Sequence, residues 1–452
     1  MVEVQILGTT LVYPSSPFPS CHRPLLLSHL DTDRILHVPF RTLRIYAPSP
    51  SPSAADPADV VAAALSAALP LFFPLAASLF RRPSDNRHEV RPPATGIPFT
   101  RAASPLTLAE LSARPGSPLL DRFAPDPAPG EALAHPLAIQ VTRLACGGFA
   151  LGACVHHALC DGAGFTQFLS AVAGFARGAE RPAVEPVWER AELLGPRSPA
   201  RVEVPLFRHV LGFDGDVARS GPYDVVAASI EGPLVREWFH VSEACMERLR
   251  NRLAEEAGSS CTTFEALSAY IWRARIKASG TPQGEVVKLV YSMNIRRLLK
   301  PAPAPAPALP AGYWGNVCVP VYVHLTVREL MEQRLWETAS LIKTSKQSVT
   351  DEYVRSYIDF QQLHYAEGIT AGKRVSAFTD WRHLGHSDID FGWGGPVSVM
   401  PLSWRLLGSL EPCFLLPNGA DGVKKKNGFK VLISLPEKVM QSFRADMEIF
   451  AS

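Results

Sequence analysis

Two hydrophobic patterns alternate along the chain, and together they predict a mixed α/β fold. Apolar residues that alternate with polar ones, or that form short continuous runs, predict strands. We assign such strands to residues 43–46, 138–144, 149–155, 235–241, 286–294, 378–381, 410–417 and 431–435. Apolar residues spaced by three or four positions predict helices over residues 57–69, 165–176, 242–257 and 263–277, with a longer helical region at 327–362.

Several proline-rich stretches interrupt these patterns. Residues 47–55 and Pro301–Pro307, where proline alternates with alanine, predict exposed loops because proline cannot enter a helix interior or an inner strand. Residues 85–130 are rich in Pro, Ala and Ser, so we expect short strands at best there. Residues 178–222 lose all regular periodicity. A chain of 452 residues is too long for one ordinary core, so two domains are expected.

The uncharged run from Val60 to Phe80 has the length of a membrane span, but other features favour a soluble helix. Pro70 and Pro74 interrupt the run, and Asp56 with Pro57 forms a good N-cap pair just before it. We therefore expect a helix from about Pro57 to Leu69 and no membrane span.

Composition narrows the class of protein further. The chain is 47% hydrophobic and 19% charged, and 45 basic residues nearly balance 43 acidic ones. This net charge of +2 indicates no strong field for nucleic acid or membranes. Eight cysteines lack metal-site or disulfide-framework spacing, so buried free thiols are expected. The start of the chain shows no secretory signal, and we expect a cytoplasmic protein.

The segment Leu151–Leu169 carries the candidate chemistry, because an apolar strand leads into His156 and His157 and a glycine-broken turn follows. A strand is a rigid mount for a general base, and Asp161 lies four residues further on. Three alternatives stand beside this one: a hydrogen-bonded core histidine, a zinc site with Cys160, and a serine-hydrolase triad. Adjacent strand residues face opposite ways, which disfavours zinc, and the chain lacks a G-x-S-x-G segment, which disfavours the triad.

A second motif supports the general-base hypothesis. Asp390–Gly394 reads DFGWG, and this pentapeptide together with His157-x-x-x-Asp161 resembles the plant BAHD family of acyl-CoA-dependent acyltransferases. The resemblance runs nearly end to end. Further segments lie between the two motifs in the order that the family uses, namely Thr263–Leu267, Tyr270–Arg273, Asn294–Arg296 and Gly312–Asn316.

The resemblance implies a fold of two similar α/β domains of the chloramphenicol acetyltransferase-like kind. Each domain has a mixed sheet, and a channel passes between them. The first domain would span residues 1–210 and include about 388–412, which cross back to it. Residues 211–222 would be the crossover linker, and residues 223–387 and 413–452 would form the second domain.

The resemblance also implies roles for particular residues. His157 would be the general base, with Asp161 of the same catalytic motif pointing away from it. Thr379 and Trp381 would line the acyl and oxyanion site. Asp390 would form a salt bridge with Arg296. The structural motif would be completed, close to the coenzyme channel, by Phe391, Gly392, Trp393 and Gly394.

Two further positions carry weaker expectations. His37 is a candidate for the acceptor pocket, although a surface or packing histidine is an equally good interpretation. The basic run Lys424–Lys426 is expected to be a solvated turn, with contact to a coenzyme phosphate as the alternative.

The implied activity is transfer of a hydroxycinnamoyl or other aromatic acyl group from acyl-CoA to a hydroxyl or amine acceptor, without an acyl-enzyme. Acyl-CoA would be a co-substrate, with no permanently bound cofactor and no metal, and the protein would be a monomer. Two other functions stay open: a catalytically silent relative that acts as a binding protein, and a thioester hydrolase. Neither a nucleic-acid nor a membrane partner is expected.

Overall fold

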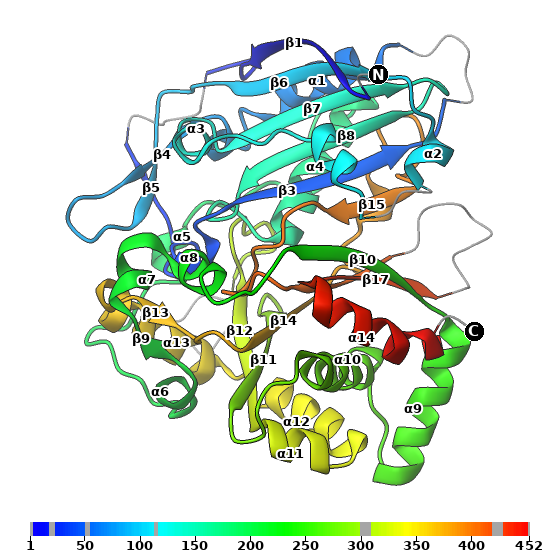
Figure 1. Cartoon of the computed structure of the whole chain (residues 1–452). Coiled ribbons are helices and arrows are strands. Elements are labelled where there is room, and N and C mark those ends of the chain that lie inside the picture. Colours follow the sequence, from blue (N-terminus) through cyan, green and yellow to red (C-terminus); the bar gives the residue numbers. More distant parts are fainter. Residues whose placement is uncertain are drawn as a thin grey trace.

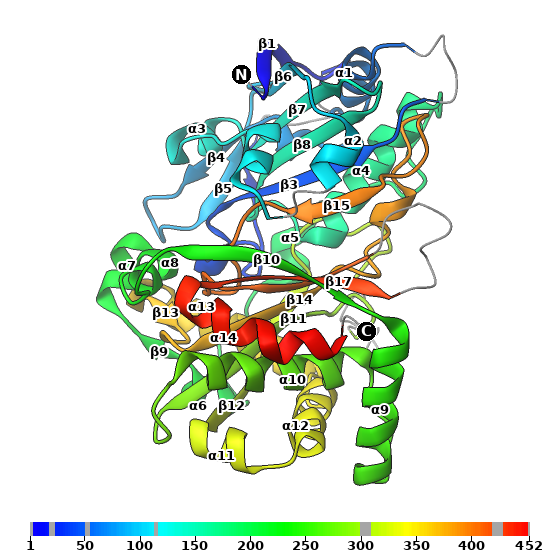
Figure 2. The same ribbon diagram turned by 45° about the vertical axis from the view of Figure 1, so that its right-hand side comes forward.

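Two six-stranded mixed sheets lie one above the other and carry most of the molecule (Figures 1 and 2). The computed structural model describes residues 3–17, 23–49, 55–112, 116–298, 309–417 and 428–450. The mixed α/β architecture predicted from the hydrophobic pattern is confirmed. Pro301–Pro307 and Lys424–Lys426 lie outside the described residues.

The N-terminal sheet has the strand order β1-β6-β7-β8-β3-β15. All its pairs are antiparallel except β6 with β7. Two helices, α1 and α4, pack together on one face of this sheet. The bounds are β1 Gln5–Val12, β6 Ile97–Ser104, β7 Leu137–Leu144, β8 Phe149–His156, β3 Pro39–Tyr46, β15 Ser398–Pro401, α1 Pro57–Ala68 and α4 Gly162–Ala176.

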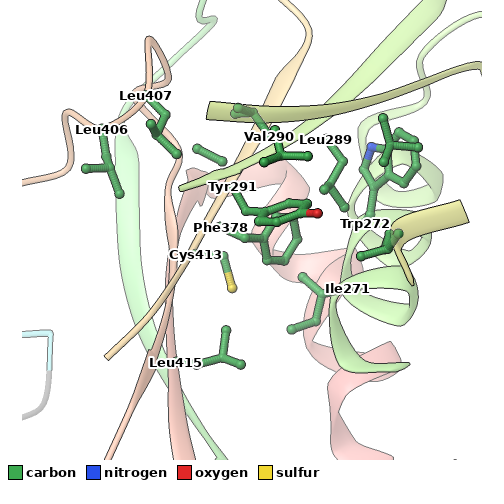
Figure 3. Close-up of a cluster of buried hydrophobic side chains, with 14 of the residues drawn as sticks. Ile271, Trp272, Leu289, Val290, Tyr291, Phe378, Leu406, Leu407, Cys413 and Leu415 are labelled. Carbon is green, nitrogen blue, oxygen red and sulfur yellow. The ribbon is translucent and has the colours of Figure 1, made fainter. Parts of the chain in front are cut away.

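The C-terminal sheet has the order β10-β17-β16-β14-β11-β12, with β14 parallel to both of its neighbours. Its helices cover the side that faces away from the first sheet, and Figure 3 shows Ile271 and Trp272 of α10 turned toward Leu289 and Tyr291 of β11. The bounds are β10 Leu234–Val241, β17 Phe429–Pro436, β16 Cys413–Leu416, β14 Val375–Asp380, β11 Val286–Asn294, β12 Cys318–Thr326, α9 Glu243–Ala257, α10 Thr263–Ser279, α11 Val327–Glu332, α12 Leu335–Gln347, α13 Asp351–His364 and α14 Glu437–Met447.

Short elements connect and flank the two sheets. Residues 178–222 hold only short helices and one short strand, as their lost periodicity predicts. The short elements are β2 Leu25–Leu26, β4 Ser78–Arg81, β5 His88–Arg91, β9 Gly212–Phe213, β13 Ile369–Thr370, α2 Leu108–Ser112, α3 Pro129–Ala134, α5 Arg190–Leu193, α6 Leu206–Val210, α7 Gly215–Ser220, α8 Pro222–Ala227, and the 3-10 helices η1 Arg34–Leu36, η2 Phe73–Leu75, η3 Pro118–Phe123, η4 Tyr365–Glu367, η5 His386–Asp388 and η6 Glu448–Phe450.

Local chemistry explains where the helix α1 begins and ends. The Asp56 side chain accepts a hydrogen bond from the Ala58 amide at 2.8 Å, and Pro57 occupies the first turn. The helix ends at Ala68, and the apolar run continues through η2 into β4. Within the described ranges, no helix is both long enough and apolar enough to cross a membrane.

Several strands were not predicted, among them β1, β6, β12 and β15. Only short strands were expected in residues 85–130, but β6 is eight residues long. Its sequence, IPFTRAAS, has no strong hydrophobic period. The strand pairs with β1 on one side and with β7 on the other, so tertiary pairing decides its length.

The chain crosses between the two sheets after β14. The orange strand β15 lies among the blue and cyan strands of the N-terminal sheet and pairs with β3, after which the chain returns to the C-terminal sheet as β16 (Figure 1). This path agrees with the expected return of residues 388–412 to the first domain. The domain boundaries themselves stay a prediction.

Candidate active site

A cavity of about 340 Å³ lies between the two sheets. Its wall is formed by β3 and β8 on one side and by β11, β12 and β14 on the other. His157, Asp161, Thr379 and Trp381 all line it. Four of the residues predicted for the site, which are far apart in the sequence, therefore meet at one cavity.

His157 stands at the end of β8, where the chain leaves the N-terminal sheet. Its amide donates a hydrogen bond to the Val38 carbonyl at 2.9 Å, and its own carbonyl accepts one from the Asn316 side chain at 2.9 Å. Its ring packs edge-on against Phe40 at 5.5 Å between centroids. These contacts fix the backbone and the ring, as a general base requires.

The neighbouring histidine faces the other way. His156 is 4% exposed and does not line the cavity, and its ring lies 5.5 Å from that of His88. This alternation is the one expected at the end of a strand. Within the described residues, no group of three or more His, Cys, Asp or Glu side chains is placed to hold a metal ion.

Burial tunes the imidazole of His157. Burial lowers its pKa below the ordinary value, and the negative charges of Asp161 and Asp31 act in the opposite direction. The net effect is a ring that is neutral at neutral pH. A neutral imidazole has a free nitrogen lone pair that can accept a proton.

Asp161 is the N-cap of α4 and an ion-pair partner. Its carboxylate accepts hydrogen bonds from the Gly164 amide at 2.8 Å and from the two terminal guanidinium nitrogens of Arg296 at 2.9 and 3.1 Å. It also accepts from the Val317 amide at 3.0 Å. Burial acts to raise the pKa of Asp161, but Arg296 and the amides outweigh burial and hold it below its ordinary value. The carboxylate is therefore charged, and it ties α4 to the C-terminal domain.

The expected salt bridge between Asp390 and Arg296 is wrong. Arg296 follows β11 on the cavity side and pairs with Asp161 instead. The carboxylate of Asp390 accepts a hydrogen bond from the Gly392 amide at 2.7 Å, and its backbone carbonyl accepts one from Arg177.

The DFGWG loop also lies away from the cavity, because none of its five residues lines the wall. Phe391 packs against Tyr46 and Trp393 packs against Phe149, with ring centroids 5.7 and 5.4 Å apart. Tyr46 and Phe149 pair at one end of β3 and β8, and His156 stands at the other end. Seven residues of strand separate the two ends by about 23 Å. The loop therefore anchors β15 and the crossing segment rather than lining the space beside His157.

Aromatic rings pack together beside His157. Trp381 packs against Phe40 and Phe414, at 6.0 and 5.5 Å between centroids, and Thr379 precedes it on β14. Both Thr379 and Trp381 are buried. Thr379 and Trp381 line the same cavity as His157.

His37 does not line the cavity. Its Nε2 atom lies 3.1 Å from the Thr32 carbonyl oxygen, and its ring packs edge-on against His88 at 4.3 Å. The packing interpretation of His37 therefore describes its surroundings better than the pocket interpretation.

Sequence reasoning missed a polar network behind His157. Asp31 accepts hydrogen bonds from the amide and side chain of Asn316 at 2.7 and 3.0 Å, and Asn316 in turn holds the His157 carbonyl. Arg190, which is fully buried, pairs with Asp31 at 3.3 Å. The available signal was an acidic residue that ends the apolar run Leu25–Leu30.

Two stacked mixed sheets, with a strand-mounted histidine at a cavity between them, define a two-domain acyltransferase of the chloramphenicol acetyltransferase-like class. Comparison with known proteins identifies the group within that class. A family model described as Transferase family matches residues 2–450. The chain belongs to this family, the plant BAHD acyltransferases.

The curated relatives cover nearly the whole chain. A 3'-N-debenzoyl-2'-deoxytaxol N-benzoyltransferase of Taxus canadensis is 32% identical over 99% of this chain and 96% of that protein. A spermidine coumaroyl-CoA acyltransferase of Arabidopsis thaliana is 32% identical, over 94% of this chain and 91% of that protein. The crystal structure of vinorine synthase shares the fold, with a TM-score of 0.74, 20% identity and coverage of 99% and 98% of the two chains. The protein is thus an acyltransferase that moves an acyl group from CoA to a hydroxyl or amine.

Proposed function

We propose that His157 is the general base of this acyl transfer and that the acyl group passes directly from acyl-CoA to the acceptor. One observation carries the proposal: the side chain of His157 lines the cavity between the sheets while its backbone is held on both sides. The burial of the ring keeps it neutral and ready to accept a proton.

The reaction needs one proton to move and return. His157 takes the proton from the acceptor hydroxyl or amine as that group attacks the thioester carbonyl carbon. The carbonyl oxygen gains negative charge, and Thr379 and Trp381 are the candidates to face it. When the carbon–sulfur bond breaks, the imidazolium gives its proton to the departing CoA thiolate. No nucleophilic serine or cysteine takes part.

Asp161 and Arg296 act on the reaction through position. Their ion pair joins the helix that follows His157 to the segment that follows β11. The ion pair keeps the two walls of the cavity in a fixed position relative to each other. Asp161 makes no contact with the acceptor in this scheme.

The donor we propose is a hydroxycinnamoyl or other aromatic acyl-CoA, and the acceptor is an alcohol or an amine. Relatives named for coumaroyl, sinapoyl and benzoyl transfer support an aromatic donor. The aromatic side chains of Phe40 and Trp381, which line the cavity, support it as well. We further propose a cytoplasmic monomer.

The test is turnover with coumaroyl-CoA or benzoyl-CoA and with spermidine or a primary alcohol, following free thiol and identifying the products by mass spectrometry. We expect acylated acceptor from the wild type and a rate roughly 10²- to 10⁴-fold lower for His157→Ala. His156→Gln is the matched control, because that ring faces away from the cavity. A His157→Ala variant that transfers at the wild-type rate would refute the base, and free acid as the product would indicate a hydrolase.

A further inference from the structure

One arginine at the cavity has no ion-pair partner among the residues that the structure describes. Among the described residues that line it, five carry a charge. Three of these have an oppositely charged partner: Asp161 with Arg296, Asp380 with Arg382 at 2.6 Å, and Lys346 with Glu265 at 2.8 Å. Asp33, the fourth, accepts hydrogen bonds from the Tyr357 hydroxyl and the Ile35 amide.

Arg44, the fifth, is 0% exposed and has no ion-pair partner in the part of the chain that the structure describes. Its two terminal nitrogens donate to neutral acceptors, Thr42 Oγ1 at 3.1 Å and His386 Nδ1 at 3.3 Å. Its Nε atom is buried without a hydrogen-bond partner. A buried guanidinium without an anion is costly, so its presence at a cavity wall requires an explanation.

His386 presents a second unused donor beside Arg44. The Nδ1 atom of His386 lies 3.3 Å from a guanidinium nitrogen of Arg44 and 3.2 Å from the Thr166 hydroxyl oxygen. A guanidinium can only donate, so we assign Nδ1 as its acceptor and place the ring proton on Nε2. The Nε2 atom is buried and has no partner within the described chain. The ring also lines the cavity, 5.0 Å from that of Trp381. Two neighbouring side chains therefore each present an N–H donor, Arg44 Nε and His386 Nε2, that lacks an acceptor among the described residues.

The position of these donors relative to His157 follows from β3. Side chains on a strand alternate, so Phe40, Thr42 and Arg44 share the face that lines the cavity. Phe40 contacts the His157 ring, and the guanidinium of Arg44 folds back to Thr42. A group bound at Arg44 would lie along the same wall as the base, within the length of one small substrate.

We propose that Arg44 and His386 form a subsite for a carboxylate carried by one of the two substrates. A carboxylate matches a guanidinium in charge and in the geometry of its two oxygens, and it can accept the Nε2 proton of His386 as well. The inference rests on the proposed function, since it places the carboxylate in the cavity of the same reaction. The carboxylate belongs either to the acyl chain of the donor or to the acceptor.

The thermal stability of variants distinguishes a binding role for Arg44 from a structural role. We expect Arg44→Met to leave the melting temperature of the free protein unchanged or to raise it, because the variant removes a buried charge that has no partner. Arg190→Met is the matched control: Arg190 is equally buried but pairs with Asp31, so its loss strands a carboxylate and lowers the melting temperature. A fall for Arg44→Met as large as that for Arg190→Met would overturn the proposal.

Ligand binding tests the charge directly. The wild type is titrated with benzoate and with benzamide, which differ in charge but hardly in shape. We expect benzoate to bind the wild type more tightly, and Arg44→Met to weaken benzoate binding roughly 10- to 100-fold with little change for benzamide. Equal affinity of the wild type for the two probes, or equal benzoate affinity of wild type and variant, would contradict a carboxylate subsite.

Paired substrates identify the source of the carboxylate. In the donor arm, glutaryl-CoA is compared with valeryl-CoA. In the acceptor arm, hydroxymethylbenzoate is compared with hydroxymethylbenzamide. We expect a preference in kcat/KM for the carboxylate member of one pair, and Arg44→Met abolishes that preference. Acyl transfer that depends on His157 but shows no carboxylate preference in either arm would refute this inference and leave the proposed function intact.

Discussion

The neighbouring histidines His156 and His157 show how one residue step along a strand separates two environments. His157 faces the cavity, and His156 packs in a cluster with His88 and His37 on the other side of the sheet. Sequence periodicity predicts this division, because alternation is a property of the strand itself. Sequence periodicity cannot predict which residues of other elements pack against each face of the strand.

Ion-pair partners are the clearest case of that limit. Arg296 and Asp161 are 135 residues apart, and only the packing of the two domains brings them to 2.9 Å. Among the described residues Asp390 has no such partner, because the loop that carries it packs at the far end of β3 and β8. For the same reason nothing in the sequence marks Arg44 as unpaired.

This exchange of partners changes what Asp390 is expected to do. Asp161→Asn should lower the free energy of unfolding by about 3–5 kcal/mol, since Arg296 keeps a mostly buried charge without a partner. Asp390→Asn should cost less than about 1 kcal/mol, because it perturbs one local turn. Denaturant titration of both variants makes the comparison. Equal losses, or a larger loss for Asp390→Asn, would show that the Asp161–Arg296 pair is not the stabilising contact.

At the scale of elements, the strand β8 positions His157 at the cavity. It is buried along its whole length, pairs with β7 and β3, and ends at His156. Its sequence, FALGACVH, contains small residues because other segments approach it closely. Gly152 faces η3: a Cβ there would lie 2.5 Å from the Cα of Ala124.

A methyl group at Gly152 should therefore displace the strand β8. We expect Gly152→Ala to cost about 1–3 kcal/mol of stability and to lower acyl transfer, because the strand must shift away from η3. Gly174→Ala on α4 is the matched control, since its Cβ would lie 3.7 Å from that of Ala179 and alanine favours the helix by about 1 kcal/mol. Melting temperatures and turnover measure both effects. A Gly152→Ala protein as stable and active as the wild type would contradict the close packing of β8 on η3.

The elements of the sheets differ in how far the sequence predicts them. Helices with a clear N-cap signal, such as α1 and α10, begin within a residue of the predicted positions. The strand β6 was not predicted, because its own sequence is weakly periodic and its pairing with β1 and β7 determines its length. Local signals such as N-caps therefore predict where helices begin, whereas strands such as β6 are fixed by their pairing partners.

On the scale of the whole molecule, the two domains share one cavity and neither encloses it alone. Residues of both sheets line the cavity, and the Asp161–Arg296 pair joins them beside it. The resemblance to a known family predicted the fold. It also identified four residues that line the cavity, namely His157, Asp161, Thr379 and Trp381. The resemblance also placed the DFGWG loop close to a coenzyme channel; in the structure the loop packs on Tyr46 and Phe149, and none of its five residues lines the cavity.

Buried histidines should make the stability of the folded protein depend on pH. Burial lowers the pKa of His88 to about 4 and that of His156 to about 3. The unfolded chain takes up these protons near pH 6.5, so their full contribution is present above that pH and is lost as the pH falls toward 4. For His88 the loss reaches about 3 kcal/mol.

Thermal unfolding between pH 7.5 and pH 4 measures this effect. We expect the melting temperature to fall across that range and His88→Leu to reduce the slope, because neither ring nitrogen of His88 has a partner among the described residues. His240→Leu, at an exposed position on β10, is the control. An unchanged slope for His88→Leu would show that His88 does not contribute to the acid sensitivity.

The strand β15 has a consequence for how the protein is made. During synthesis the ribosome releases β3 early, but the strand that closes its open edge is encoded only at Ser398–Pro401. The N-terminal sheet therefore cannot be completed until most of the second domain has been translated. Until then, the backbone N–H and C=O groups along the outer edge of β3 lack their partners. Nascent chains halted before residue 398 should then be the form that chaperones bind and that aggregates.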